Sequence, residues 1–142
     1  MLHLRKGVCG VVAVLLVNGV ASAQTPVTVV RGIPQFKISE GGTERQPEAL
    51  TRAVAVNLGV VISQIGDTYY WASRENTPMV AVDSGGAFIT YLAVNGNGYV
   101  RVIKPEMKSA ASLLGGPESQ YDYVEHLLQG LRSITYYGTL TP

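Results

Sequence analysis

The chain has 142 residues, of which 46% are hydrophobic and 15% charged, and its 11 basic and 10 acidic residues give a formal net charge of +1. This length corresponds to a single domain that can bury a core of its own. From Arg31 to Arg132 the basic residues occur singly and form no stripe, which excludes the usual electrostatic pattern of a nucleic-acid-binding protein.

The first 23 residues have the pattern of a cleavable secretory signal peptide. Arg5 and Lys6 give a positive start, an uncharged apolar run covers residues 7–17, and residues 21–23 are small, as signal peptidase requires. The apolar run is shorter than the ~20 residues of a bilayer-spanning helix. We therefore expect a periplasmic or secreted protein that starts at Gln24 and has no membrane span after cleavage.

Signal cleavage also removes Cys9, the single cysteine of the chain. The mature chain then has no disulfide, no thiolate nucleophile and no cysteine-ligated metal. Its nine basic and ten acidic residues leave a formal charge of −1, which implies no electrostatic partner.

The mature chain begins with an arm and an ambiguous segment. Residues 24–45 mix a β-prone stretch with prolines and glycines, which predicts an N-terminal arm with at most one edge strand. Pro47 favours the start of a helix, and apolar residues at helical spacing follow it. Because residues 54–62 are rich in β-branched side chains, this helix is expected to give way early to a strand that ends at Ile65.

The centre of the chain has the pattern of short strands separated by turns. Residues 95–98 contain two Asn-Gly steps, which predict a β-hairpin. Residues 87–94 are largely apolar on both faces, which predicts a central strand covered on both sides. The expected strands of this region are 68–73, 79–83, 87–94 and 99–103.

The C-terminal part predicts two helices and a last strand. A short helix is expected at 106–114, and a longer one after Pro117, with its apolar stripe running from Tyr121 to Leu131. Residues 133–140 follow as a strand. The expected fold is a single α+β domain over residues 46–142, an antiparallel β-meander of about four to six strands packed against one or two helices.

Motifs for catalysis or cofactor binding are absent from the sequence. His126, the single histidine of the mature chain, lies about 160° from the apolar stripe of the expected last helix, so we expect it at the surface and predict no metal site. Residues 96–98 match the start of a dinucleotide-binding glycine motif, but Arg101 replaces its third glycine. We therefore assign no catalytic residue and no cofactor.

The most informative segment is a cluster of aromatic and polar residues at the end of an expected strand. Aromatic faces next to a guanidinium and a carboxylate suit a sugar, a peptide or a partner's side chain. The alternative is that the aromatic side chains fill the core and that the polar residues only form a solvated turn. The predicted binding residues are Trp71, Ser73, Arg74, Glu75 and Asn76.

Three functions are compatible with this sequence. The first is a non-enzymatic binding or interaction module of the cell envelope or the extracellular space, with a protein, peptide or glycan as partner. The second is a small hydrolase of cell-wall or sugar polymers that uses two carboxylates, such as Asp67 and Glu75. The third is a structural subunit of an envelope assembly. We favour the first, because catalytic groups are sparse and aromatic residues are plentiful.

Overall fold

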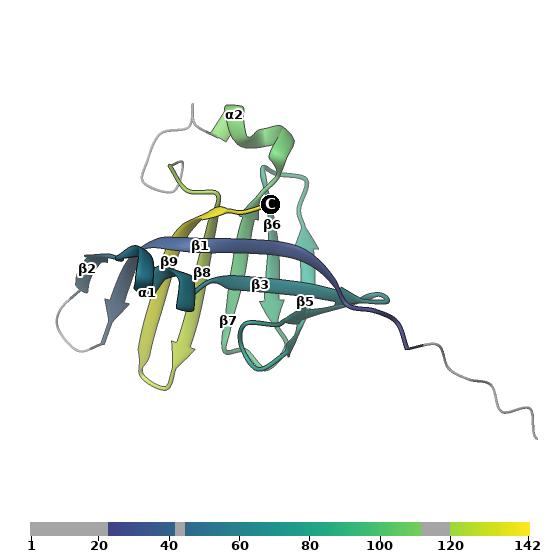
Figure 1. Cartoon of the computed structure of the whole chain (residues 1–142), viewed down its shortest axis with the longest axis horizontal. Helices are drawn as coiled ribbons and strands as arrows, with labels where there is room; N and C mark the ends of the chain where they lie inside the picture. Colours follow the sequence, from purple (N-terminus) through teal and green to yellow (C-terminus); the bar gives the residue numbers. More distant parts are fainter. Residues whose placement is uncertain (1–22, 42–44, 112–119) are drawn as a thin grey trace, which may run out of the picture.

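The computed structural model describes residues 23–41, 45–111 and 120–142 (Figure 1). Residues 1–22 of the expected signal peptide lie outside the described residues. The elements are β1 (Val27–Glu40), β2 (Arg45–Ala49), α1 (Arg52–Asn57), β3 (Val60–Ile65), β4 (Thr68–Trp71), β5 (Thr77–Asp83), β6 (Phe88–Ala93), β7 (Gly98–Ile103), the 3-10 helix η1 (Pro105–Met107), α2 (Lys108–Ala111), β8 (Tyr123–Gln129) and β9 (Arg132–Leu140).

The strands form a closed antiparallel barrel of eight strands with one additional strand, and this corrects the expected α+β meander. From β3 to β9 each strand pairs with the next, and β1 closes the barrel by pairing with both β3 and β9. β2 is the additional strand and pairs with β1. The helices are too short to form a layer, since α1 has six residues and α2 has four. In the described part of the chain no helix is long and apolar enough to cross a membrane.

The long strand β1 replaces the expected N-terminal arm. Its first half, Val27–Gly32, pairs with β3, and its second half pairs with β9 from Gly32 to Glu40. β3 pairs with one edge of β1 only as far as Gly32, and further along the same edge residues Phe36–Glu40 pair with β2. β1 is therefore paired on both edges and holds the first and last strands of the barrel together, which a single edge strand cannot do.

The interior of the barrel is filled by alternate residues of the strands, as the two-residue period of a β-strand requires. The outer face of β6 is open, because Leu92 is 42% exposed, so this strand is not covered on both sides as predicted. The buried cluster consists of Val30, Val60, Ile62, Trp71, Met79, Tyr91, Ala93, Val100, Val102 and Tyr123.

The predicted last helix is also wrong, because its residues form the hairpin of β8 and β9. Its apolar stripe is divided between the two faces of a strand: Leu127 packs against the buried core, whereas Leu128 is 45% exposed. His126 lies on the outer face, where its ring stacks on Tyr99 and its Nδ1 lies 2.9 Å from Thr135 Oγ1. The expected short helix at 106–114 is present as η1 and α2 up to Ala111, and its last residues lie outside the described part.

The ring of Tyr123 packs inside the barrel against the backbone of the two strands that close it. A Cβ atom at Gly32 on β1 or at Gly138 on β9 would overlap this ring. Gly138 stands opposite Tyr123 in the β8–β9 pair and opposite Pro34 in the β1–β9 pair. The two glycines therefore provide the space that lets a large aromatic side chain lie at the closure of the barrel.

We expect Gly138→Ala to lower the free energy of unfolding by about 2 kcal/mol or more, because the added methyl group meets both the Tyr123 ring and a β1 carbonyl oxygen. Gly86→Ala is the matched control, since nothing lies within 4 Å of a Cβ atom at that position. Urea denaturation of both variants measures the difference. Equal stability of the two variants would contradict the described packing of Tyr123.

Candidate functional site

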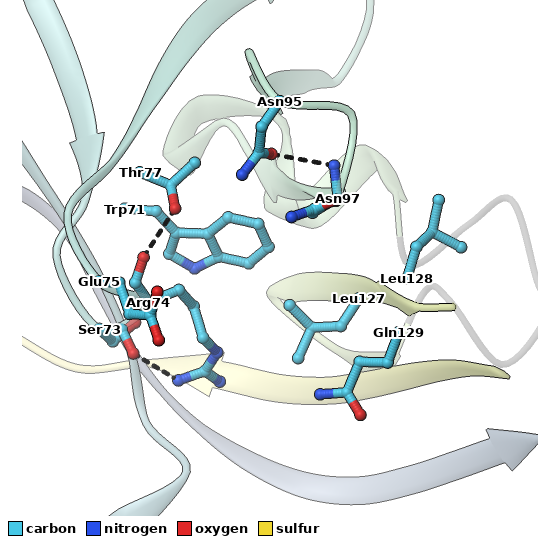
Figure 2. Close-up of a pocket in the computed structure, with 10 residues that line it drawn as sticks. All are labelled: Trp71, Ser73, Arg74, Glu75, Thr77, Asn95, Asn97, Leu127, Leu128 and Gln129. Atoms are coloured by element: carbon cyan, nitrogen blue, oxygen red, sulfur yellow. Dashed lines mark hydrogen bonds between the residues drawn. The ribbon is translucent and has the colours of Figure 1, made fainter. Parts of the chain in front are cut away.

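A pocket with a volume of about 350 Å³ opens between connections of the barrel (Figure 2). These connections lie at the end of the barrel opposite α2 (Figure 1). The walls of the pocket come from the β4–β5 turn, the β6–β7 turn and the end of β8, which the meander brings to the same end of the barrel. We call it the mouth pocket. Its lining residues are Trp71, Ser73, Arg74, Glu75, Thr77, Asn95, Asn97, Leu127, Leu128 and Gln129.

Four of the five residues predicted from the sequence line this pocket, namely Trp71, Ser73, Arg74 and Glu75. The fifth, Asn76, is exposed in the adjacent turn and is not part of the lining. The expectation of a solvated arginine does not hold, because the Arg74 side chain is only 23% exposed and is paired with a buried carboxylate. Whether these residues bind a ligand stays a prediction.

A tight turn at the end of β4 aims the Arg74 side chain at the barrel. The Thr77 backbone N–H donates to the Arg74 carbonyl at 3.1 Å, and Glu75 and Asn76 between them have φ angles of 55° and 53°. Two successive residues with positive φ angles reverse the chain within the five-residue connection between Trp71 and Thr77. Asparagine adopts this conformation more readily than most residues, which explains Asn76 as a turn residue.

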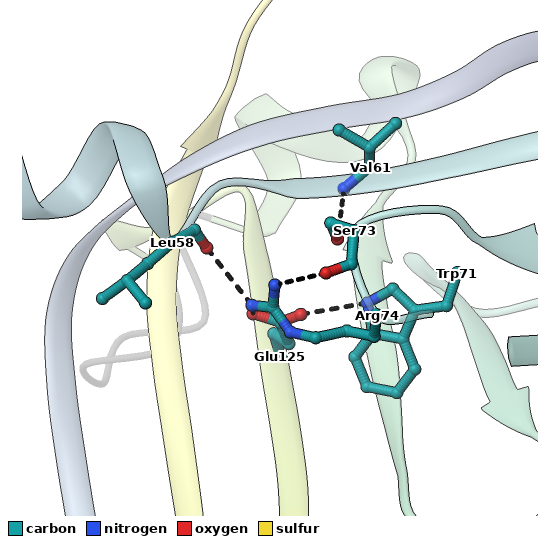
Figure 3. Close-up of polar contacts among 6 residues, drawn as sticks. All are labelled: Leu58, Val61, Trp71, Ser73, Arg74 and Glu125. Atoms are coloured by element: carbon teal, nitrogen blue, oxygen red, sulfur yellow. Dashed lines mark hydrogen bonds and ion pairs between the residues drawn. The ribbon is translucent and has the colours of Figure 1, made fainter. Parts of the chain in front are cut away.

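Ser73 has a structural role at the edge of the same pocket. Its backbone N–H donates to the Val61 carbonyl at 3.3 Å, and its Oγ accepts the Val61 backbone N–H at 2.9 Å (Figure 3). The hydroxyl therefore takes the place of a backbone carbonyl and extends the β3–β4 pairing by one step. This contact holds the start of the turn that carries Arg74.

The floor of the mouth pocket is a hydrogen-bonded group centred on Glu125 of β8 (Figure 3). The Trp71 Nε1–H donates to Glu125 Oε1 at 3.0 Å, and the Arg74 Nη2–H donates to Oε2 at 2.8 Å. The Glu125 side chain is fully buried. Both of its oxygens accept from donors, so this arrangement fits the ionised carboxylate.

The guanidinium of Arg74 is also fixed by two backbone carbonyl groups. Its Nη1 donates to the Ser73 carbonyl at 2.9 Å, and its Nη2 donates to the Leu58 carbonyl at 3.2 Å. Leu58 is the C-terminal cap of α1, where carbonyl groups lack partners within the helix. Arg74 thus joins the β4–β5 turn to α1 as well as to β8.

Burial raises the pKa of Glu125 from its ordinary value of 4.5 to about 7, since a carboxylate inside the barrel loses the solvation of water. The positive charge of Arg74 and the hydrogen bonds from Trp71 and Arg74 act in the opposite direction and lower the pKa. The loss of solvation is the larger effect. Glu125 therefore changes charge near neutral pH although it lies deep in the fold.

The arrangement does not form the pair of carboxylates that a hydrolase would need. Asp67 precedes the first residue of β4 and Glu75 follows its last, so the two lie at opposite ends of this strand. Glu125 is covered by Trp71 and Arg74 and is not among the lining residues. Among the described residues, no group of three or more His, Cys, Asp or Glu side chains is placed to hold a metal ion.

The contributions of the β6–β7 turn and of the end of β8 to the mouth pocket were not predicted from the sequence. Glu125 falls within the expected last helix, and nothing in its neighbourhood along the chain indicates a partner 51 residues away. Asn95 and Asn97 were explained fully as turn residues, although both also line the pocket. Comparison of the chain with protein-family models, curated proteins and solved structures found no match.

We expect the stability of the protein to fall as the pH rises through the range from about 4.5 to 7. Because the pKa of Glu125 is raised, the folded state binds the carboxyl proton more tightly than the unfolded chain does. The stability that this proton contributes is therefore fully present below pH 4.5 and is lost above pH 7. The change amounts to roughly 3 kcal/mol in the free energy of unfolding. Urea denaturation of the unmodified protein and of Glu125→Gln at pH 4.5, 6 and 8 measures it.

The Glu125→Gln variant keeps a carbonyl oxygen for one donor but has no proton to lose, so the part of the slope that Glu125 causes should disappear. All other titrating groups are shared by the two proteins and cancel in the comparison. An identical pH dependence in both would show that Glu125 ionises normally in the folded protein.

Proposed function

We propose that this chain is a non-enzymatic exported binding protein whose mouth pocket holds a small polar ligand, such as a sugar or the end of a peptide. The observation that carries the proposal is the pocket itself: about 350 Å³ of space above a floor of Trp71 and Arg74, which the buried Glu125 holds in place from beneath. This volume falls within the usual range for small-molecule sites, about 300–1,000 Å³.

The pocket suits a ligand that forms hydrogen bonds. Its rim carries the side chains of Asn95, Asn97 and Gln129, which supply both amide donors and carbonyl acceptors (Figure 2). Leu127 adds an apolar surface next to them. A folded partner surface would not enter a space of this size, so among the partners considered a glycan unit or a peptide end fits best.

Binding is favoured over catalysis because the ionisable groups at the pocket are already engaged. Glu125 is buried beneath Trp71 and Arg74, so a substrate in the pocket does not reach its carboxylate. Glu75 is exposed to solvent, which leaves it without the desolvation that tunes an acid or a base. Fixed donors and acceptors around a preformed space are what a binding site requires.

Export is part of the proposal and is supported by the sequence pattern of residues 1–23. A cell-envelope or extracellular location would give the pocket access to sugars and peptides outside the cytoplasm.

Trp71 makes binding directly measurable, because it is the single tryptophan of the chain and forms the floor of the pocket. We expect neutral and acidic sugars or short peptides to change its fluorescence, and to shift the amide resonances of residues 95–98 and 127–129. Gln129→Ala should weaken the best ligand about fivefold through loss of one hydrogen bond, roughly 1 kcal/mol. Gln35→Ala, on the exposed side of β1, is the matched control and should bind normally.

Resonance shifts confined to residues outside the mouth pocket would contradict this assignment, as would equal weakening by the two glutamine variants.

The export proposal predicts that the mature protein starts at Gln24. Intact-mass analysis of material collected from outside the cytoplasm should give the mass of residues 24–142. A mass that retains residues 1–23, or that carries a lipid, would contradict cleavage at this site.

A further inference from the structure

A ligand in the mouth pocket can reach the guanidinium of Arg74 but not the carboxylate of Glu125. The Arg74 side chain is 23% exposed and lines the pocket, whereas the Glu125 side chain is fully buried behind it. A guanidinium has five N–H donors, and three contacts account for three of them, to Ser73, Leu58 and Glu125. No hydrogen bond from the other two to any described residue is found.

The charges of the pocket select the class of ligand. Arg74 is the one basic residue among its lining residues. The one acidic lining residue, Glu75, is exposed to solvent, which screens its charge. The amide groups of Asn97 and Gln129 are neutral. A cationic ligand would be repelled by Arg74 before it approached Glu125. A carboxylate presents two oxygen atoms in one plane, which matches the planar donor fork of a guanidinium.

A ligand carboxylate on the two remaining N–H groups of Arg74 would share the positive charge of one guanidinium with Glu125. If Glu125 stayed ionised, two carboxylates would face one cation, and a buried charge would keep only part of its compensation. Both costs vanish when Glu125 takes up one proton from solvent. The ion pair of Arg74 and Glu125 is then replaced by an ion pair of Arg74 and the ligand. Glu125 lies beside this new pair as an uncharged acid.

The surroundings of Glu125 allow it to accept this proton. Besides Arg74, the titratable groups acting on it are Tyr123 of its own strand and Tyr136, which stands opposite it on β9. Burial raises the pKa of both tyrosines, so they remain neutral and neither supplies the proton nor competes for it. Lys37 and Glu48 act on Tyr136 and are paired with each other at 3.2 Å.

We infer that the mouth pocket binds the carboxylate group of a small acidic ligand on Arg74, and that Glu125 takes up one proton as the ligand replaces it as the counter-ion of the guanidinium. This inference rests on the proposed binding function and names its ligand class. The carboxylate can belong to a sugar acid or to the C-terminus of a peptide, and the geometry at Arg74 is the same for both.

The test uses four probes with the mature protein: glucuronate and its neutral counterpart glucose, and N-acetylalanine and its neutral amide. Trp71 fluorescence and amide shifts give the affinity at pH 6 and pH 8, where the probe carboxylates stay ionised. Calorimetry in two buffers of different ionisation enthalpy counts the protons taken up. We expect an acidic probe to bind about tenfold more tightly at pH 6 than at pH 8, with close to one proton taken up at pH 8, because only protein with Glu125 protonated accepts it.

Variants separate the roles of the two residues. Glu125→Gln should bind the acidic probe with equal affinity at both pH values and with no proton uptake. The double variant Arg74→Gln/Glu125→Gln removes the buried pair together, so no unpaired charge is left in the fold, and it should bind the acidic probe at least tenfold more weakly than Glu125→Gln. Arg101→Gln, on the outer wall, should behave like the unmodified protein.

The acidic probe that binds more tightly shows whether the carboxylate comes from a sugar acid or from a peptide terminus. Binding of acidic probes without proton uptake, or with equal affinity at both pH values, would overturn the exchange at Glu125. Binding of the neutral probes alone would overturn the inference and leave the proposed binding function standing. If none of the four probes shifts the resonances of residues 95–98 and 127–129, both fail.

Discussion

The buried carboxylate of Glu125 is the constraint on which the pocket end of the barrel depends. A charge inside a barrel of apolar side chains is tolerated only with strong donors around it, and Trp71 and Arg74 supply them. Because Arg74 also donates to the last carbonyl group of α1, the same charge fixes the β4–β5 turn and the entry into β3. The shape of the mouth pocket and its electrostatics therefore follow from a single residue of β8.

The strands between residues 68 and 103 and the strand near the C-terminus were predictable from the sequence, because turns punctuate them and β-branched or aromatic residues fill them. Closure into a barrel was not, since it depends on pairing between β1 and β9, about a hundred residues apart. Residues 123–129 were assigned to a helix instead of a strand for a physical reason. β8 carries a charged Glu125 inside and an exposed Leu128 outside, which hides the alternation of a strand.

The candidate site was predictable in part. The segment from Trp71 to Glu75 drew attention because it places aromatic, cationic and acidic side chains at the end of a strand, and the structure places these residues at one pocket. Its position relative to Glu125 was not accessible, because the pairing of distant strands sets it. The two readings of this segment, core and surface, are both realised in Trp71, which lies in the core and also lines the pocket.

The pairing of β1 with β9 has a consequence for how this chain acquires its fold. The first strand of the barrel finds its second partner only when Arg132–Leu140, the last strand, has been made and released. Until then the second half of β1 has one unpaired edge, and the space for the Tyr123 ring between Gly32 and Gly138 does not exist. Contacts of such long sequence separation close late and slowly, so the nascent chain must be kept from pairing through this edge with other chains.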